Sequence, residues 1–269
     1  MAPPPAPLPA PLQALAADPA HGALFLDFDG TLSAIVDDPV GARPLPGVPA
    51  LLADLAARFD LVAVISGRPT AFLRQALGTP PGVELVGLYG LERALAASPG
   101  GDAQQWSTVV DEVVAEARAA APEGVYVEPK GLTVTLHWRH APDERPWVTQ
   151  FAERQHDRRG LDVHGGRMEL ELRPPLQVDK GTVIRGLAAE RPPGRLRQVA
   201  AFGDDLGDLP AFEAVTTLGR PGHPVGAVRV AAVDHESPAE VAARADLTVD
   251  GATGAVELLR RLAEAASQT

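Results

Sequence analysis

The sequence predicts an α/β fold in which a doubly wound, Rossmann-like parallel sheet is interrupted by an inserted α+β domain. Outside residues 104–177, short apolar runs alternate with segments of helical period, and this order builds a parallel sheet with helices on both faces. Within residues 104–177 the order changes to helix, strand, strand, helix, strand, strand (αββαββ). Polar residues follow several of the core runs, at the strand ends where doubly wound sheets bind their ligands.

The expected core strands are short and almost wholly apolar, as strands buried on both faces are. They are Ala23 to Leu26, Leu61 to Ile65, Leu85 to Leu88, Val199 to Phe202 and Val228 to Val233. Apolar residues at helical spacing predict the helices Val48 to Arg58, Thr70 to Leu77 and Thr182 to Ala189. We therefore expect residues 21–103 and 178–269 to form one core domain.

The segment 104–177 is expected to form a separate antiparallel layer, with helices at Trp106 to Ala120 and around Glu144 to Arg158. Polar and apolar residues alternate through its strand candidates, so that successive side chains point to opposite faces. Thr133, Thr135, His137 and Arg139 share the polar face of one strand, opposite Leu132, Val134, Leu136 and Trp138. One face of this sheet should pack on the helices and the other should be polar.

Composition narrows the possible functions. The net charge of −11 leaves no basic stripe for nucleic acid, and no apolar run approaches the length of a membrane span. The absence of cysteine excludes disulfides and thiolate chemistry. Residues 1–20 are rich in proline and alanine and lack the pattern of a signal peptide, so we expect a flexible extension and a cytoplasmic protein. The sequence leaves the oligomeric state open, and a monomer is the working expectation.

Asp27 and Asp29 lie two positions apart at the end of the first strand, in LFLDFDGT, so both carboxylates can project to the same side. One could attack phosphorus and form an acyl phosphate, while the other protonates the leaving oxygen and later deprotonates the hydrolytic water. Gly30 would allow the sharp turn that follows. The alternative is an ordinary turn, because Asp and Gly are common there.

Ser66, Gly67 and Arg68 follow the second strand, and Lys180 opens a helical segment in VDKGT. The Ser66 hydroxyl and a nearby backbone N–H could bind a phosphate oxygen, although this motif taken alone favours Ser66 as the N-cap of the next helix. Lys180 could neutralise a phosphate and keep a carboxylate ionised, or could be a surface lysine. Because Lys130 and Lys180 are the only lysines among 24 basic residues, we expect both at sites that require an ammonium group.

Three carboxylates, Asp204, Asp205 and Asp208, follow the strand ending at Phe202, in GDDLGD. Like charges this close are unfavourable without a counter-ion, and oxygen ligands are those that Mg²⁺ prefers. The alternative is an acidic helix start, where carboxylates are favourable.

In this order, DFDGT, SGR, DKG and GDDLGD resemble the four motifs of the haloacid dehalogenase-like phosphatase superfamily. The resemblance implies a magnesium-dependent phosphomonoester hydrolase with Asp27 as nucleophile and Asp29 as acid and base. It implies phosphate binding by Ser66, Gly67 and Lys180. The implied metal set is Asp27, Asp204, Asp208 and Asp29, the last through its backbone carbonyl, with Asp205 and Asp208 as outer or orienting groups.

The polar face of the inserted domain could bind a hydroxyl-rich leaving group, or could be a solvated face with cross-strand charge pairs. The strings VYVEPKGLTVTLHWR, MELELRP and GLYGLE resemble the trehalose-6-phosphate phosphatase family, in which such an insert is a cap domain. The resemblance implies hydrolysis of trehalose 6-phosphate. It also implies that Glu128, Lys130 and Glu171 bind the disaccharide. The residues expected to bind substrate are Arg68, Glu128, Lys130, His137, Arg139 and Glu171.

Some positions depart from that family. Tyr89 stands where its members usually have His, and Gly207 and Leu209 stand where they often have Thr and Glu. Another sugar phosphate, such as sucrose 6-phosphate or a hexose phosphate, is therefore an alternative substrate. A catalytically silent sugar-phosphate sensor is an alternative of another class. Linkers near Pro99 to Gly101 and Pro174 to Gln177 would let a cap open and close.

Overall fold

The computed structural model describes residues 7–36, 41–97, 103–166, 168–218, 225–235 and 237–268. Contacts divide the chain into two compact units, which are Met1–Gly90 with Val178–Thr269 (unit 1) and Leu91–Gln177 (unit 2). Unit 2 therefore begins earlier than residue 104, because a helix that the sequence did not predict, α4 (Leu91–Ala97), groups with it. The linker proposed near Pro99 to Gly101 lies outside the described residues.

Unit 1 contains a parallel sheet of six strands in the order β10-β9-β8-β1-β2-β3. The strands are β1 (Gly22–Leu26), β2 (Leu61–Ile65), β3 (Val83–Val86), β8 (Gln198–Gly203), β9 (Gly226–Val233) and β10 (Leu247–Asp250). The strands β2 and β3 are added on one side of β1, and β8, β9 and β10 are added on the other side. The strand order therefore reverses between β1 and β8. This arrangement confirms the predicted doubly wound fold, and ligands bind at such a reversal point.

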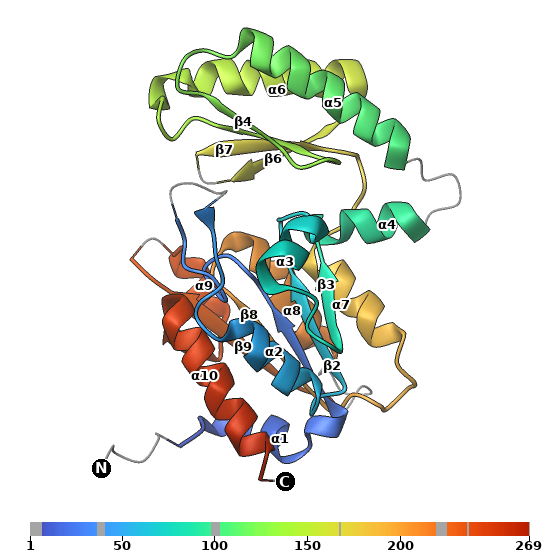
Figure 1. Ribbon diagram of the computed structural model, residues 1–269, viewed down its shortest axis with the longest axis vertical. Coiled ribbons are helices and arrows are strands. Elements are labelled where there is room, and N and C mark those ends of the chain that lie inside the picture. The colour runs from blue at the N-terminus through green and yellow to red at the C-terminus, as the bar shows by residue number, and fades with distance from the viewer. Residues whose placement is uncertain are drawn as a thin grey trace. The chain divides into compact units, whose positions relative to one another are not determined.

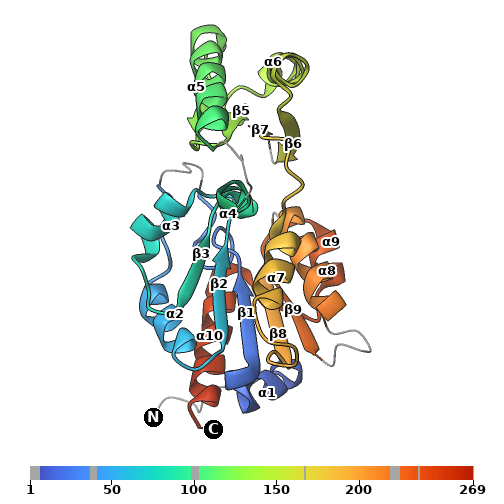
Figure 2. The same cartoon turned by 90° about the vertical axis from the view of Figure 1, so that its right-hand side faces the viewer.

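Helices cover both faces of this sheet (Figure 2). One face carries α1 (Ala10–Ala17), α2 (Val48–Ala56), α3 (Thr70–Leu77) and α10 (Gly251–Ala266), and the other carries α7 (Lys180–Ala189), α8 (Leu209–Leu218) and α9 (Ala239–Arg244). In β1, Leu24 and Leu26 pack on the first group while Ala23 and Phe25 pack on the second. Double-sided burial explains why these strands read as continuous apolar runs.

The expected flexible extension over residues 1–20 is wrong for its second half. Residues 10–17 form α1, with Pro11 in the first turn, where proline is tolerated. Leu12 and Leu15 are 0% exposed and pack in the same cluster as Leu259 and Leu262 of α10. Their spacing of three residues places them on one helical face, which the proline-rich composition concealed. Residues 1–6 lie outside the described residues.

Unit 2 contains the predicted αββαββ order and an antiparallel sheet, β4-β5-β7-β6. Its main elements are α5 (Ala103–Ala120), β4 (Tyr126–Pro129), β5 (Val134–His137), α6 (Arg145–Arg159), β6 (Asp162–Gly166) and β7 (Glu169–Arg173). The helices α5 and α6 pack on one face of the sheet (Figure 1), where Val134, Leu136 and Phe151 are buried. Arg139 was predicted to extend the β5 face, but it lies in the turn after β5.

Candidate functional site

The residues of the four sequence motifs lie together at the carboxyl edge of the unit 1 sheet. Asp27 directly follows β1, Ser66 directly follows β2 and Asp204 directly follows β8. Because neighbouring parallel strands end at the same edge, these residues are brought together from distant parts of the chain. Lys180 joins them as the first residue of α7.

Lys180 is the centre of the site. Its Nζ donates to Asp27 Oδ1 at 2.5 Å and to Asp208 Oδ1 at 2.5 Å. The exposed fractions of the three side chains are only 4% for Lys180, 7% for Asp27 and 1% for Asp208. A capping box starts the helix, since Asp179 Oδ1 accepts from Thr182 N at 2.6 Å. The cap fixes the backbone from which Lys180 extends.

A buried acidic cluster adjoins Lys180. Asp27, Asp204 and Asp208 each offer one carboxylate oxygen, and these three oxygens lie within 4.8 Å of one another. Asp208 Oδ2 also accepts from Asp204 N at 2.9 Å and Asp205 N at 3.2 Å, which holds the GDDLGD loop in place. Gly30 has a φ of +76°, and a Cβ there would lie 2.2 Å from Asp204 Cγ, so only glycine leaves room for this carboxylate.

The charges of this cluster are not balanced by Lys180 alone. Burial raises the pKa of the Asp27 carboxyl well above its ordinary value, and Lys180 opposes that rise. Burial also raises the pKa of Asp204 to about 10 and that of Asp205 to about 6, with nearby carboxylates contributing. Burial disfavours the Lys180 ammonium, but Asp208 and Asp27 outweigh it and raise its pKa well above the ordinary value. Clustered oxygen donors with surplus negative charge fit a hard divalent cation.

Asp29 is oriented differently from Asp27. Its carboxylate accepts from Arg68 Nε at 2.8 Å and from Arg68 Nη2 at 2.9 Å, in a bidentate ion pair. The Arg68 guanidinium also lies 4.8 Å from the centre of the Phe72 ring. The Asp29 carboxylate is not one of the three clustered carboxylates, and the metal role predicted for Asp29 concerned its backbone carbonyl. Arg68, predicted to bind substrate, contacts the predicted acid and base.

Ser66 is 1% exposed, and its Oγ accepts from Arg68 N at 3.1 Å. It does not cap α3, since the N-cap of that helix is Pro69. Gly67 lies in the same short loop, directly against the side chain of Tyr89. Ser66, Gly67 and Arg68, here called the phosphate loop, thus lie at the sheet edge that carries Asp27.

The polar face of the unit 2 sheet carries four of the predicted substrate residues. Lys130 Nζ lies 3.6 Å from Glu128 Oε2 and 3.8 Å from Glu171 Oε1, so one ammonium faces two carboxylates. His137 Nε2 lies 2.9 Å from the same Glu128 oxygen. The fifth, Arg139, is half-buried in its turn and has no ion pair within the described part of the chain.

The sequence did not predict Glu169 as a site residue. It lies opposite His137 in the β5–β7 ladder, and its Oε2 is 3.0 Å from His137 Nδ1. Burial disfavours the charged imidazole, but Glu128 and Glu169 outweigh it and raise the His137 pKa. In MELELRP, Glu169 alternates with apolar neighbours and so shares a polar face with Glu171, but only the strand register brings it to His137. The sequence therefore indicated the face on which Glu169 lies, but not its contact with His137.

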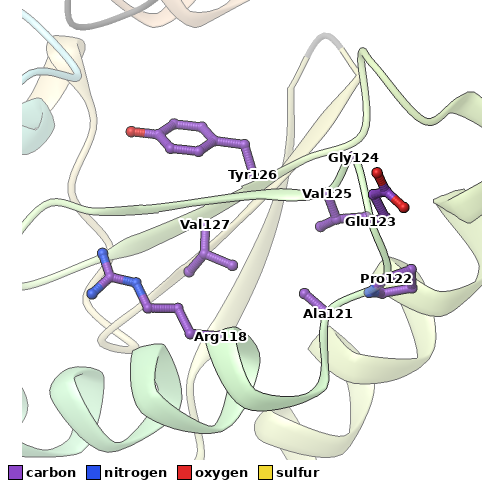
Figure 3. Close-up of a pocket in the computed structure, with 8 residues that line it drawn as sticks. All are labelled: Arg118, Ala121, Pro122, Glu123, Gly124, Val125, Tyr126 and Val127. Atoms are coloured by element: carbon purple, nitrogen blue, oxygen red, sulfur yellow. The ribbon is translucent and has the colours of Figure 1, made fainter.

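A shallow pocket of about 340 Å³ in unit 2 contains none of the predicted site residues. It lies where α5 ends and β4 begins, and Figure 3 shows Val127 and Arg118 on the opposite side of β4 from Tyr126. The Tyr126 ring instead packs against His137, with ring centres 5.6 Å apart. No helix in the described part of the chain combines the length and the apolar character of a membrane span.

Comparison with solved structures supports the fold. A trehalose-6-phosphate phosphatase related protein aligns with a TM-score of 0.72 and 24% identity, covering 91% of this chain and 99% of that one. The C-terminal domain of Candida albicans trehalose-6-phosphate phosphatase aligns with a TM-score of 0.71 and 21% identity, covering 97% and 98%. A haloacid dehalogenase-like hydrolase from Bacteroides thetaiotaomicron aligns with a TM-score of 0.56 and 15% identity, covering 90% and 99%. At these identities the likeness concerns the fold.

Sequence comparison identifies the family. The trehalose-phosphate phosphatase of Mycobacterium avium is 37% identical in an alignment of length 258 that covers 91% of this chain and 62% of that protein. The chain thus spans less than two thirds of the length of this relative. A probable trehalose-phosphate phosphatase of Sinorhizobium fredii is 34% identical, over 80% of this chain and 83% of its own. The trehalose-phosphatase family model matches residues 25–248, from β1 to β10, and the chain is a member of that family.

Proposed function

We propose that the protein hydrolyses trehalose 6-phosphate to trehalose and phosphate, through an aspartyl-phosphate intermediate. The observation that carries the proposal is the buried contact of Lys180 Nζ with Asp27 Oδ1 at 2.5 Å, beside the acidic cluster. A carboxylate paired with an ammonium at a strand end is placed for nucleophilic attack on a phosphate. Membership of the trehalose-phosphatase family supports this substrate.

In the first step, an Asp27 carboxylate oxygen attacks phosphorus, and the bond from phosphorus to the sugar oxygen breaks. Asp29 donates a proton to that leaving oxygen, so trehalose departs as a neutral alcohol. In the second step, Asp29 takes a proton from the water that attacks the aspartyl-phosphate, which releases phosphate and restores Asp27. Lys180 favours the ionised form of Asp27 against the effect of burial.

The residues that would hold Mg²⁺ are Asp27, Asp204 and the backbone carbonyl of Asp29. Both Asp208 oxygens already accept hydrogen bonds, from Lys180 and from the GDDLGD backbone, so we assign Asp208 to orienting the cluster. When bound, Mg²⁺ would supply the positive charge that stabilises the phosphoryl oxygens. The three buried carboxylates, and the raised pKa values of Asp27 and Asp204, support a divalent cation here.

Ser66, Gly67 and Lys180 would bind the phosphate group. Glu128, Lys130, His137 and Glu171 would bind sugar hydroxyls, because each hydroxyl needs a donor or acceptor partner and this face offers both. Arg68 is assigned to orienting Asp29, because its Nε and Nη2 both donate to that carboxylate. A substrate role for Arg139, a cytoplasmic location and a monomeric state stay predictions.

Phosphate release from a panel of substrates, measured in saturating Mg²⁺, tests the proposal. Trehalose 6-phosphate should be hydrolysed with a far higher kcat/KM than sucrose 6-phosphate or glucose 6-phosphate. Comparable turnover of glucose 6-phosphate would mean that the sugar specificity is misassigned. Binding of trehalose 6-phosphate without turnover would instead indicate a silent sensor.

A further inference from the structure

The backbone at the end of β3 has an unusual conformation. Leu88 and Tyr89 are consecutive residues with φ values of 48° and 54°, and Gly90 follows with a φ of 94°. The left-handed region is unfavourable for residues with a Cβ, and two such residues in succession are rare. Strain of this kind persists only where the surroundings enforce it, and it concentrates at functional sites.

Two hydrogen bonds join this strained segment to the phosphate loop. Leu88 N donates to Arg68 O at 3.0 Å, and Tyr89 N donates to Ser66 O at 2.9 Å. In a trans peptide the carbonyl and the N–H point in opposite directions. The bond from Tyr89 therefore turns the Gly67 N–H away from Tyr89, and this N–H has no hydrogen-bond partner within the described residues. The strained conformation thus fixes the direction of a backbone donor, the Gly67 N–H.

The Tyr89 side chain contacts both phosphate-binding elements. A Cβ on Gly67 would lie 2.5 Å from the Tyr89 hydroxyl oxygen and 2.6 Å from the ring carbon that carries it, so the ring rests on the Gly67 backbone. Lys180 Nζ lies 5.9 Å from the ring centre, within the range at which the negative face of an aromatic ring attracts an ammonium. One side chain therefore restrains the loop and the ammonium together.

We propose that Tyr89 is a positioning residue of the phosphate site. Its backbone aims the Gly67 N–H, and its ring restrains both the Gly67 loop and the Lys180 ammonium. Tyr89 acts through these two groups and makes no bond to the reacting atoms. The inference rests on the proposed function in that it assumes a phosphate ester as substrate, but it does not depend on which sugar the ester carries.

The test compares Tyr89→Phe, which keeps the ring, with Tyr89→Leu, which removes it. Each is assayed with trehalose 6-phosphate and with p-nitrophenyl phosphate, and inorganic phosphate binding is measured by calorimetry. Tyr89→Leu should lower kcat about 10-fold with both substrates and weaken phosphate binding, because the Gly67 loop and the Lys180 ammonium lose the ring that restrains them. This is less than the loss of about 10²–10³-fold that follows when an oxyanion donor is removed altogether. Tyr89→Phe should stay within about 3-fold of wild type, because it retains the face that attracts the ammonium.

Tyr126→Leu is the matched control, because Tyr126 is the only other tyrosine of the chain and lies in unit 2. It should leave p-nitrophenyl phosphate hydrolysis and phosphate binding unchanged. If Tyr89→Leu does not fold, Gly67→Ala serves instead, since the added methyl group must displace the ring. Gly67→Ala should then show the same loss with both substrates.

Three results would overturn the inference: a loss confined to trehalose 6-phosphate, equal impairment of Tyr89→Phe and Tyr89→Leu, or no loss in Tyr89→Leu or its replacement Gly67→Ala. The first would assign Tyr89 to the sugar, and the second would assign the effect to its hydroxyl. If wild type hydrolyses p-nitrophenyl phosphate but not trehalose 6-phosphate, the proposed function fails while the Tyr89 comparison can still be read. If it hydrolyses neither, phosphate binding alone decides the inference.

Discussion

Replacing Lys180 with methionine should destabilise the protein strongly when no metal is present. Its ammonium is 2.5 Å from oxygens of Asp27 and Asp208, in a site where no side chain of the three is more than 7% exposed. Removing one partner of a buried ion pair costs about 3–5 kcal/mol, because the remaining charge is left without compensation. At about 2–4 °C per kcal/mol, the Tm should fall by roughly 6–20 °C.

The measurement is thermal and urea unfolding in EDTA, with Lys130→Met as the matched control. Lys130 is the other lysine of the chain, and its Nζ is 3.6 and 3.8 Å from its two carboxylates, so its loss should destabilise less. The deficit of Lys180→Met should shrink at lower pH, because Asp27 can then take up a proton. Equal stability of Lys180→Met and Lys130→Met would refute the reasoning, since the ammonium would then balance no buried charge.

Two further predictions concern the metal site of unit 1 and His137 of unit 2. Adding Mg²⁺ to EDTA-treated wild type should raise the Tm, because a ligand that binds only the folded state stabilises it. Asp204→Asn should abolish activity and should also remove this rise. A full Mg²⁺ response in Asp204→Asn would contradict the role of Asp204 as a metal ligand. His137 has a raised pKa because Glu128 and Glu169 outweigh burial, so the folded state holds its proton where the unfolded state has released it. The stability from this proton is present below the unfolded pKa of about 6.5 and is lost as pH rises through the folded value. The Tm advantage of wild type over His137→Gln should therefore be larger at acidic than at alkaline pH, and parallel curves would contradict it.

Much of the fold and the site edge could be predicted from the sequence, because burial and strand ends leave local patterns. The apolar run of β1 is buried on both faces, and Asp27 directly follows it. The same reasoning applies to Ser66 after β2 and Asp204 after β8. Since parallel strands end at one edge, their common location follows from the fold class alone.

The remainder depends on contacts that no local pattern encodes. The bond between Asp29 and Arg68 joins residues far apart in sequence, and the pairing of His137 with Glu169 requires the strand register. The helix α1 was hidden because the proline- and alanine-rich composition of residues 1–20 suggested a flexible segment, while Leu12, Leu15 and Ala16 bury one face of the helix. The strained conformation of Tyr89 arises from hydrogen bonds to another loop, so composition does not reveal it.

The central claim is that Asp27 attacks the phosphate of trehalose 6-phosphate. The direct measurement is the initial rate of phosphate release from trehalose 6-phosphate in saturating Mg²⁺, for wild type and for Asp27→Asn of matched folded content. We predict rapid release by wild type and a fall of about 10³-fold or more in Asp27→Asn, as expected when a nucleophile is removed. Full activity in Asp27→Asn would contradict the account, because the reaction would then not require this carboxylate.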